Sequence, residues 1–291
     1  MTSHDRRFRF GAMAATARSA KEWVSTAQHV EALGFSTLLC PDTTGTLAPF
    51  TALSAAAAAT ETLRVGTIVL AAPLRTPGTA AWERVTLDAL SGGRFELGLG
   101  AGRPDAARDA ARLGLPFGSA AERIAQLAAT IAAVRARFAG SEPAAQYDSV
   151  RGVQQPGPPI LVAGLGPRML RLAAQQADML TFGLPPQSTE DDLVAKTQEL
   201  RRIDAAAFDR LELVLNVALV GENAPPHASR WLGADPAELI RGGSITTLVG
   251  TPRQMADTLL RRRERTGVSY TVVNAMFADQ VAPVIELLAD Q

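Results

Sequence analysis

Cysteine is almost missing from this chain of 291 residues, in which Cys40 is the single example. One cysteine excludes a disulfide framework and any metal or iron–sulfur site built from several thiolates. The three histidines, His4, His29 and His227, are far apart, so their spacing does not indicate a metal site. Lysine is also scarce, with two lysines against twenty-seven arginines, which we attribute to codon usage rather than to chemistry.

Net charge and long apolar runs are missing as well. Lys plus Arg and Asp plus Glu each number 29, so the chain shows no basic footprint for nucleic acid or for an anionic membrane. The most apolar run, residues 52–59, is far shorter than the ~18–20 residues of a membrane span. The polar, basic N-terminus does not have the pattern of a signal peptide. We therefore expect a soluble, cytoplasmic protein that binds neither nucleic acid nor membranes.

Short β-branched runs alternate with longer amphipathic stretches along the whole chain. Strands are predicted at residues 8–11, 36–40, 64–70, 94–99, 159–163, 179–182, 211–220 and 270–273. Helices are predicted at residues 19–33, 49–60, 79–90, 119–138, 167–177, 189–204, 251–266 and 279–289, the first opened by a capping box of Ser19 and Glu22. Near-continuous apolar strands are typical of parallel strands buried on both faces. Eight strand–helix units predict a single (β/α)8 TIM barrel domain over residues 1–291, with a doubly wound sheet as the alternative.

Two glycine clusters directly follow predicted strands, Gly98-Leu99-Gly100-Ala101-Gly102 and Gly164-Leu165-Gly166. Neither matches the dinucleotide-binding fingerprint, because the third glycine position is occupied by Arg103 in the first cluster and by Met169 in the second. The sequence therefore argues against a Rossmann-type NAD site.

Each glycine cluster admits a functional and a structural interpretation. The segment from Ala163 to Arg168 joins a strand directly to a helix, whose free N–H groups and positive dipole end favour a phosphate. Glycine allows close approach of that phosphate, and Arg168 can add a charged fork. The alternative is a tight turn without a ligand. Similarly, Gly98, Gly100 and Gly102 either keep a barrel mouth open for a flat ring or permit a helix to pack closely on the strand.

Seven segments together resemble the bacterial luciferase-like oxidoreductases, which use flavin or the deazaflavin coenzyme F420. The most specific segment is Leu87-Asp88-Ala89-Leu90-Ser91-Gly92-Gly93-Arg94, followed by residues 97–102. The other five segments are residues 32–35, 63–67, 160–164, 166–174 and 248–252. The resemblance runs from about residue 8 to residue 288 and implies a TIM barrel with the cofactor ring over its carboxyl-terminal mouth.

The resemblance also implies chemistry. Compact length and an arginine- and alanine-rich composition favour the F420 branch, in which hydride passes between the deazaflavin and a small organic substrate, and suggest an actinobacterial source. The alternative is an FMN-dependent monooxygenase that uses reduced flavin and oxygen. A barrel that only binds a flavin or serves as a subunit partner is a third hypothesis. The expected partners are a small-molecule substrate, a second copy of the chain in a homodimer, and a separate reductase that regenerates the reduced cofactor.

Asp42 is the predicted catalytic residue. It follows the second predicted strand, and in F420 enzymes that this chain resembles an aspartate here lies against the cofactor ring, often followed by histidine. Thr43 follows here, so the resemblance does not supply a histidine acid or base. The alternative is a turn residue whose carboxylate bonds to neighbouring N–H groups.

The resemblance implies a cofactor-binding set spread over several strand ends. It consists of Thr67, Ile68, Val69, Gly100, Ala101, Gly102, Arg103, Ala163, Gly164, Leu165, Gly166 and Arg168. The family often has a non-proline cis peptide within the strand that contains Thr67 to Leu70. Arg103 stands where sugar-phosphate dehydrogenases of the F420 branch carry glutamate, which argues against a sugar-phosphate substrate. Arg103 favours an anionic group, pairs with Asp105, or is a surface residue.

Three further features have mainly structural interpretations. The run Arg261–Arg263 is expected on a solvated helix face, and Cys40 is expected to be buried and inert. Tyr147, His227 and Trp231 lie in irregular segments and either line a substrate pocket or cover the barrel.

Overall fold

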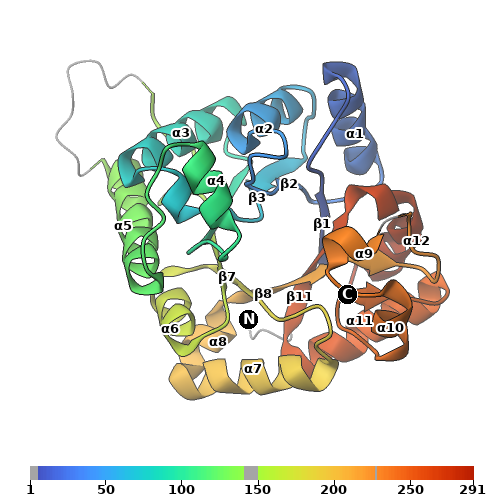
Figure 1. Cartoon of the computed structure of the whole chain (residues 1–291). Helices are drawn as coiled ribbons and strands as arrows, with labels where there is room; N and C mark the ends of the chain where they lie inside the picture. The colour runs from blue at the N-terminus through green and yellow to red at the C-terminus, as the bar shows by residue number, and fades with distance from the viewer. Residues whose placement is uncertain (1–5, 141–149, 227) are drawn as a thin grey trace. The chain divides into compact units, whose positions relative to one another are not determined.

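The computed structural model describes residues 6–140, 150–226 and 228–291, and the chain divides into two compact units. The first unit comprises residues 14–31 and 37–163, and the second comprises residues up to 13, 32–36 and 164–291. Parallel strands alternate with helices in both units (Figure 1), which is the (β/α)8 barrel fold class that the sequence predicts. Tyr147, His4 and His227 lie outside the described residues.

The first unit contains parallel strands in the order β2-β3-β5-β6, with the short β4 beside β5. Its strands are β2 (Thr37–Cys40), β3 (Arg64–Thr67), β4 (Leu70–Ala71), β5 (Phe95–Gly100) and β6 (Ile160–Gly164). Its helices are α1 (Ala20–Ala32), α2 (Pro49–Ala58), α3 (Pro77–Leu90), α4 (Ala106–Arg112), α5 (Ala120–Ala139) and the 3-10 helix η2 (Ala72–Leu74). The strands are almost entirely buried, as expected for a parallel sheet covered by helices.

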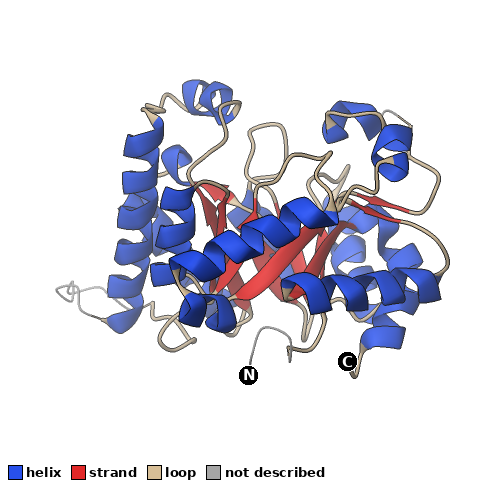
Figure 2. Cartoon of the chain, turned by 90° about the horizontal axis from the view of Figure 1, so that it is seen from below, coloured by secondary structure: helices blue, strands red, loops and turns tan. Residues whose placement is uncertain are grey.

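The second unit contains parallel strands in the order β1-β11-β8-β7 and a separate pair, β9-β10. Figure 2 draws the strands of the chain in red and its helices in blue. The strands of the second unit are β1 (Arg9–Met13), β7 (Met179–Phe182), β8 (Glu212–Val217), β9 (Leu219–Val220), β10 (Thr247–Leu248) and β11 (Val268–Asn274). Its helices are α6 (Pro167–Gln176), α7 (Glu190–Ile203), α8 (Ala205–Arg210), α9 (Ala228–Leu232), α10 (Pro236–Arg241), α11 (Pro252–Thr266), α12 (Ala278–Leu288) and the 3-10 helix η3 (Ala275–Phe277). Among the residues that the structure describes, no helix has the length and apolar character needed to cross a membrane.

Two predicted strands are interrupted. The strand expected at 64–70 ends at Thr67 and resumes at Leu70, and the peptide bond Ile68–Val69 between them is cis, as the resemblance implied. The strand expected at 211–220 breaks at Ala218. There the N–H groups of Ala218 and Leu219 both donate to the carbonyl of Thr246, at 2.7 and 3.0 Å, so the chain leaves β8 to pair with β10.

The capping box predicted for Ser19 and Glu22 is formed only in part. Ser19 Oγ accepts from the Glu22 N–H at 3.2 Å, but the Glu22 carboxylate accepts from the Arg18 N–H at 2.7 Å, so the capping box lacks its expected second bond. The sequence analysis missed four helices of five to seven residues, α4, α8, α9 and α10. Such helices span at most two turns, so their apolar periodicity is too short to detect.

The prediction of a solvated face for Arg261–Arg263 is wrong. Arg262 is buried and donates to the carbonyls of Ile245 and Thr247, both at 3.2 Å. Arg261 lies 3.5 Å from the Glu190 carboxylate, and Arg263 lies over the Phe8 ring at 4.3 Å. A charge run on one helix reaches inward here because successive residues point to different sides of a helix.

Residues 87–94, the segment that carries the most specific resemblance, have a structural role. The buried Asp88 carboxylate accepts from the backbone N–H groups of Val153 and Gln154, at 2.5 and 3.0 Å, and from the Gln154 side chain at 2.6 Å. Arg94 donates to the carbonyls of Ala57 and Leu63, at 2.7 and 2.6 Å. These bonds fasten the segments that lead into β3, β5 and β6, at the amino ends of those strands.

Candidate functional site

Asp42 lies just beyond the carboxyl end of β2 in the first unit, and its side chain is 7% exposed. Its Oδ2 accepts from Arg75 Nη1 at 2.6 Å and from the Ala71 N–H at 3.1 Å, while its Oδ1 accepts from Arg75 Nη2 at 3.1 Å. Both partners lie about thirty positions further along the chain, so the carboxylate does not cap its own turn. Asp42 is therefore a fixed anion that ties the end of β2 to the segment around η2.

The turn after Asp42 is held by other groups. Gly45 N–H donates to Thr43 Oγ1 at 3.2 Å, and Thr46 N–H donates to the Thr43 carbonyl at 3.1 Å. Thr44 donates through its N–H and its hydroxyl to Asp109 of α4. The loop after β2 and the helix after β5 are consequently joined beside Asp42.

A second acid and a second arginine accompany the Asp42–Arg75 pair. Arg75 Nε donates to Glu83 Oε2 at 3.2 Å, and burial raises the pKa of Glu83 above its ordinary value. Arg84, the next residue on α3, is 1% exposed, and its Nε and Nη1 have no hydrogen-bond partner in the part of the chain that the structure describes. Burial lowers the pKa of the Arg84 guanidinium to about 9, with Arg75 adding to the effect. Asp42 thus belongs to a cluster of two carboxylates and two guanidinium groups.

Gly98 has a structural role that differs from the helix–strand packing expected for it, because it allows two strands to approach closely. A Cβ at this position would lie 1.9 Å from the Thr67 carbonyl oxygen, so no side chain fits between β3 and β5. Thr67 is buried, and its Oγ1 accepts from the Gly98 N–H at 3.0 Å and donates to the Gly98 carbonyl at 2.9 Å. Thr67, predicted as a cofactor-binding residue, therefore uses its hydroxyl to join two strands. Gly100 faces Val69, whose Cγ2 would be 3.0 Å from a Cβ.

The loop after β5 is anchored from α5. The carbonyl of Ala101 accepts from Arg123 Nε at 3.0 Å, and the Arg123 guanidinium lies 4.3 Å from the centre of the Phe117 ring. Gly102 has a φ of +78°, which glycine adopts without strain. Arg103 is 86% exposed and lies 3.7 Å from the Asp105 carboxylate, so it projects into solvent.

The predicted phosphate segment joins β6 to α6. Gly164, the last residue of β6, packs closely on α6, since a Cβ there would lie 2.6 Å from Met169 Cβ. Gly166 is the N-cap of α6 and has no side-chain cap, and a Cβ there would meet no atom within 4 Å. Arg168 is exposed, while Ala163 and Leu165 are half-buried. The helix start is therefore open, whereas Gly164 is required by packing.

Several of the predicted site residues lie at the carboxyl ends of their strands. In the first unit, Asp42, the Ile68–Val69 peptide and residues 100–103 all follow the carboxyl ends of the parallel strands β2, β3 and β5. Carboxyl ends of parallel strands lie at the same edge of a sheet. Gly164 ends β6, which pairs in parallel with β5 through Ala163 and Gly100.

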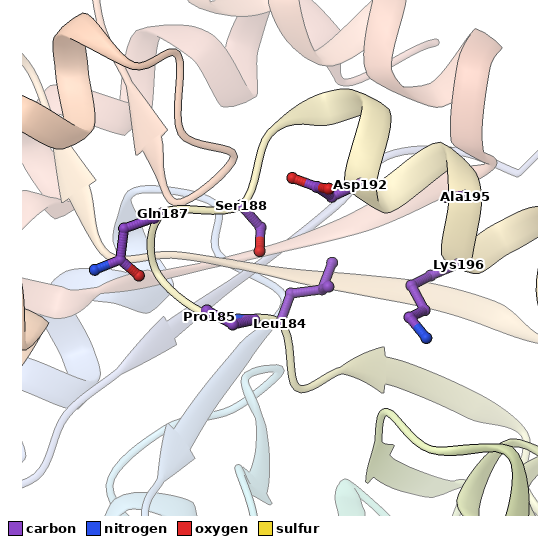
Figure 3. A pocket seen from close by; sticks show the side chains of 7 residues that line it. All are labelled: Leu184, Pro185, Gln187, Ser188, Asp192, Ala195 and Lys196. Atoms are coloured by element: carbon purple, nitrogen blue, oxygen red, sulfur yellow. The ribbon is translucent and has the colours of Figure 1, made fainter.

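The second unit contains a pocket of about 460 Å³ after β7 (Figure 3). It is lined by Leu184, Pro185, Gln187, Ser188, Asp192, Ala195 and Lys196. Lys196 Nζ donates to Glu199 at 2.8 Å, and the Asp192 carboxylate accepts from the Thr189 N–H at 2.8 Å. Both charged side chains are thus already engaged, and none of the predicted site residues lines this pocket.

Sequence reasoning missed Asn216 at a strand end of the second unit. Asn216 is the one exposed residue among the six residues of β8. The detectable signal was a polar side chain inside the apolar run Leu213-Val214-Leu215-Asn216-Val217. Within the described ranges, no group of three or more His, Cys, Asp or Glu side chains is placed to hold a metal ion.

Cys40 is expected to resist alkylation in the folded protein. It is buried at the end of β2, and burial raises the pKa of its thiol to about 12. At pH 8 only ~10⁻⁴ of the thiol is then the reactive thiolate. Mass spectrometry after exposure to iodoacetamide should find the native chain unmodified and the urea-unfolded chain fully modified. Rapid modification of the native chain would contradict this description of Cys40.

Comparison with known proteins was made on sequence and on structure. The sequence model of the family described as luciferase-like monooxygenase matches residues 6–222. The F420-dependent glucose-6-phosphate dehydrogenase of Beutenbergia cavernae is 38% identical over 134 residues, which cover 43% of this chain and 39% of that protein. The 4-hydroxyprotoasukamycin monooxygenase of Streptomyces nodosus subsp. asukaensis is 33% identical over 169 residues, which cover 53% and 44%. This chain therefore spans less than half the length of each of these relatives.

Solved structures share the fold at low sequence identity. The coenzyme F420 dependent tetrahydromethanopterin reductase from Methanopyrus kandleri has a TM-score of 0.76 at 15% identity, covering 97% of this chain and 98% of that one. An F420-dependent secondary alcohol dehydrogenase in complex with an F420-acetone adduct has a TM-score of 0.72 at 14% identity, covering 96% and 99%. A monooxygenase from Streptomyces bottropensis has a TM-score of 0.69 at 21% identity, covering 97% and 98%. At these identities the likeness shows the fold alone.

Proposed function

This chain belongs to the luciferase-like monooxygenase family, and on that premise we propose that it is an oxidoreductase that uses coenzyme F420 and transfers a hydride to or from a small organic substrate. The coarser statement, an oxidoreductase that depends on F420 or flavin, is supported by relatives of both kinds. The choice of F420 is favoured by the strand–helix repeat, whose internal additions are short helices such as α4, α9 and α10.

The observation that carries the proposal is the fixed carboxylate of Asp42 at the carboxyl ends of the strands of the first unit. Asp42, the Ile68–Val69 peptide and the loop 100–103 follow strands that run in parallel. When bound, a deazaflavin supplies a carbon that carries hydride and does not activate oxygen. In this proposal the Asp42 carboxylate is held in one orientation, and its negative charge orients the cofactor ring. Its pairing with Arg75 favours this role over that of a mobile proton carrier.

The start of α6 fits the phosphate that both F420 and FMN carry. Gly166 leaves open space at the N-cap, and among the described residues no side chain caps the first N–H groups of the helix. Unpaired N–H groups at a helix start, together with the helix dipole, bind anions. Arg168 is exposed in the first turn, and its side chain has no hydrogen bond or ion pair with any described residue, so it can add a guanidinium.

Gly166→Leu is expected to weaken the binding of F420 or FMN by at least tenfold, about 1.4 kcal/mol. The leucine fills the space that a phosphate needs, and it meets no protein atom near its Cβ, so the chain should fold. Fluorescence titration with each cofactor measures the affinity. Gly78→Leu is the matched control, because Gly78 on α3 is also open and exposed. Equal affinities for wild type and Gly166→Leu would place the phosphate elsewhere.

The second candidate function is an FMN-dependent monooxygenase. It is favoured by the 33% identity to 4-hydroxyprotoasukamycin monooxygenase over just over half of this chain. Fluorescence titration of the purified protein with F420 and with FMN separates the two candidates, followed by oxygen-electrode measurements with reduced FMN. We expect tighter binding of F420 and no protein-dependent oxygen uptake. Tighter binding of FMN with oxygen uptake would instead establish the monooxygenase, and binding of neither would reject both functions.

Assembly and cofactor supply complete the proposal. We propose a homodimer, supported by two exposed apolar side chains on α3, Trp82 at 66% and Leu90 at 65% exposure. A separate reductase or dehydrogenase would return the cofactor to the redox state that the reaction needs.

A further inference from the structure

One face of the second unit's sheet carries polar side chains. Successive side chains of a strand point to opposite faces, and residues paired in register share a face. Arg9 of β1 lies over the Tyr270 ring of β11 at 4.4 Å and donates to Glu212 of β8 at 2.7 Å. Arg9, Tyr270 and Glu212 therefore define this face, which we call the polar face. On the opposite face Phe10 and Leu213 are buried and apolar, and Thr271, the register partner of Phe10, is buried and polar.

Three uncharged polar residues continue the polar face toward the carboxyl ends of the strands. Asn216 lies four residues beyond Glu212 on β8, and its register partner on β11 is Val272. Asn274 lies two residues beyond Val272, and Thr181 of β7 pairs with Val214. At strand spacings of about 4.8 Å and rises of about 3.3 Å per residue, Asn216 lies roughly 8 Å from each of the other two, Cα to Cα.

Asn216 is the exposed member of this trio. Its side chain makes no hydrogen bond or ion pair with any residue that the structure describes, whereas Asn274 Oδ1 accepts from the Met276 N–H at 3.0 Å. The chain leaves β8 after Val217 and forms α9 and α10 before it returns in β10. The segment that contains α9 and α10 therefore begins at the carboxyl end of β8, near Asn216. A polar group on a barrel strand at its carboxyl end is placed to meet a ligand.

The chemistry of the polar face near Asn216 is neutral. The charged residues further down, Arg9 and Glu212, form an ion pair with each other. Asn216, Asn274 and Thr181 offer amide and hydroxyl groups and no counter-ion for a charged substrate. An amide N–H donates well to a carbonyl oxygen, and donation to that oxygen also draws electrons from the carbon that accepts hydride.

We propose that Asn216 is a substrate-binding residue that donates its side-chain N–H to the carbonyl oxygen of an uncharged ketone or enone. The inference rests on the proposed function and narrows its substrate class. A neutral substrate would distinguish this chain from enzymes that recognise an anionic substrate such as a sugar phosphate. Arg103 agrees with this, because its side chain projects into solvent.

The test uses cyclohex-2-enone, an uncharged enone, and the full-length protein without cofactor. Saturation-transfer NMR titrations compare wild type with Asn216→Ala, Asn216→Asp and the control Asn223→Ala, an exposed asparagine in the loop after β9. Losing one neutral hydrogen bond should weaken binding roughly three- to tenfold in Asn216→Ala. Asn216→Asp should be weaker still, because a carboxylate repels the carbonyl oxygen. Asn223→Ala should match wild type.

Parallel fluorescence titrations with F420 and FMN separate this inference from the proposed function. We expect cofactor affinity in Asn216→Ala within twofold of wild type. Unchanged enone binding in Asn216→Ala, no enone binding to wild type, or a loss confined to cofactor affinity would each overturn the role of Asn216. Failure of both cofactors to bind wild type would instead overturn the proposed function, whatever the enone titration shows.

Discussion

Gly98→Ala is expected to lose more than about 4 kcal/mol of folding free energy or to prevent folding altogether. The added methyl carbon would lie 1.9 Å from the Thr67 carbonyl oxygen, which belongs to the backbone of β3 and cannot rotate away. The two hydrogen bonds between Thr67 Oγ1 and Gly98 hold β3 and β5 at this separation. The alanine can therefore be accommodated only by separating two buried strands.

Urea denaturation followed by circular dichroism measures this loss. Gly78→Ala is the control, since Gly78 lies in the first turn of α3 with no atom within 4 Å of a Cβ. In that position alanine should leave stability unchanged or raise it by about 0.5–1 kcal/mol. A Gly98→Ala protein within 1 kcal/mol of wild type would show that β3 and β5 separate easily.

Asp42→Asn is expected to reduce turnover by roughly 10²-fold or more while cofactor affinity changes less than tenfold. Asparagine keeps the shape of the side chain and removes the charge that the proposal assigns to orienting the ring. It also leaves Arg75 with Glu83 as its one remaining carboxylate partner among the described residues, which should cost about 1–3 kcal/mol of stability. The variant should still fold.

Single-turnover oxidation of bound reduced cofactor measures the effect, with the ketone or enone that wild type reduces fastest. Asp257→Asn on the exposed side of α11 is the control and should behave as wild type. Arg75→Met keeps the Asp42 carboxylate but frees it from its partner. If turnover depends on the orientation in which Arg75 holds the carboxylate, Arg75→Met also loses turnover. A wild-type rate in Asp42→Asn would leave Asp42 with a structural role alone.

The sequence predicted the regular part of the fold well, because long apolar strands and capped helices produce strong local signals. Strand β7 has the predicted bounds, and α11 begins one residue after the Thr251 cap. The breaks at Ile68–Val69 and at Ala218 were not predicted from periodicity, because apolar residues continue through both. Partners far away in the sequence, such as Thr246, decide where those strands end.

The candidate site was harder to predict, since its key contacts join residues that are distant in sequence. Nothing around Asp42 indicates that Arg75 occupies both of its carboxylate oxygens. The glycine pattern was visible, but it did not distinguish Gly98 and Gly164, which close packing requires, from Gly166, which is open. Asn216 could be noticed as a polar residue inside an apolar run, but the sequence did not show that it would be the exposed residue of its strand.

The bonds of Asp88 and Arg94 have a consequence for how relatives are recognised. Both residues hold chain segments at the amino ends of β3, β5 and β6, the opposite ends from Asp42 and Gly100. A motif search built on residues 87–94 therefore finds proteins that share the barrel scaffold, whatever reaction takes place at the carboxyl ends of the strands. An F420-dependent dehydrogenase and a monooxygenase accordingly both match this chain. Sorting such relatives by chemistry requires comparing the residues that follow the strands, beginning with those equivalent to Asp42, Arg103 and Asn216.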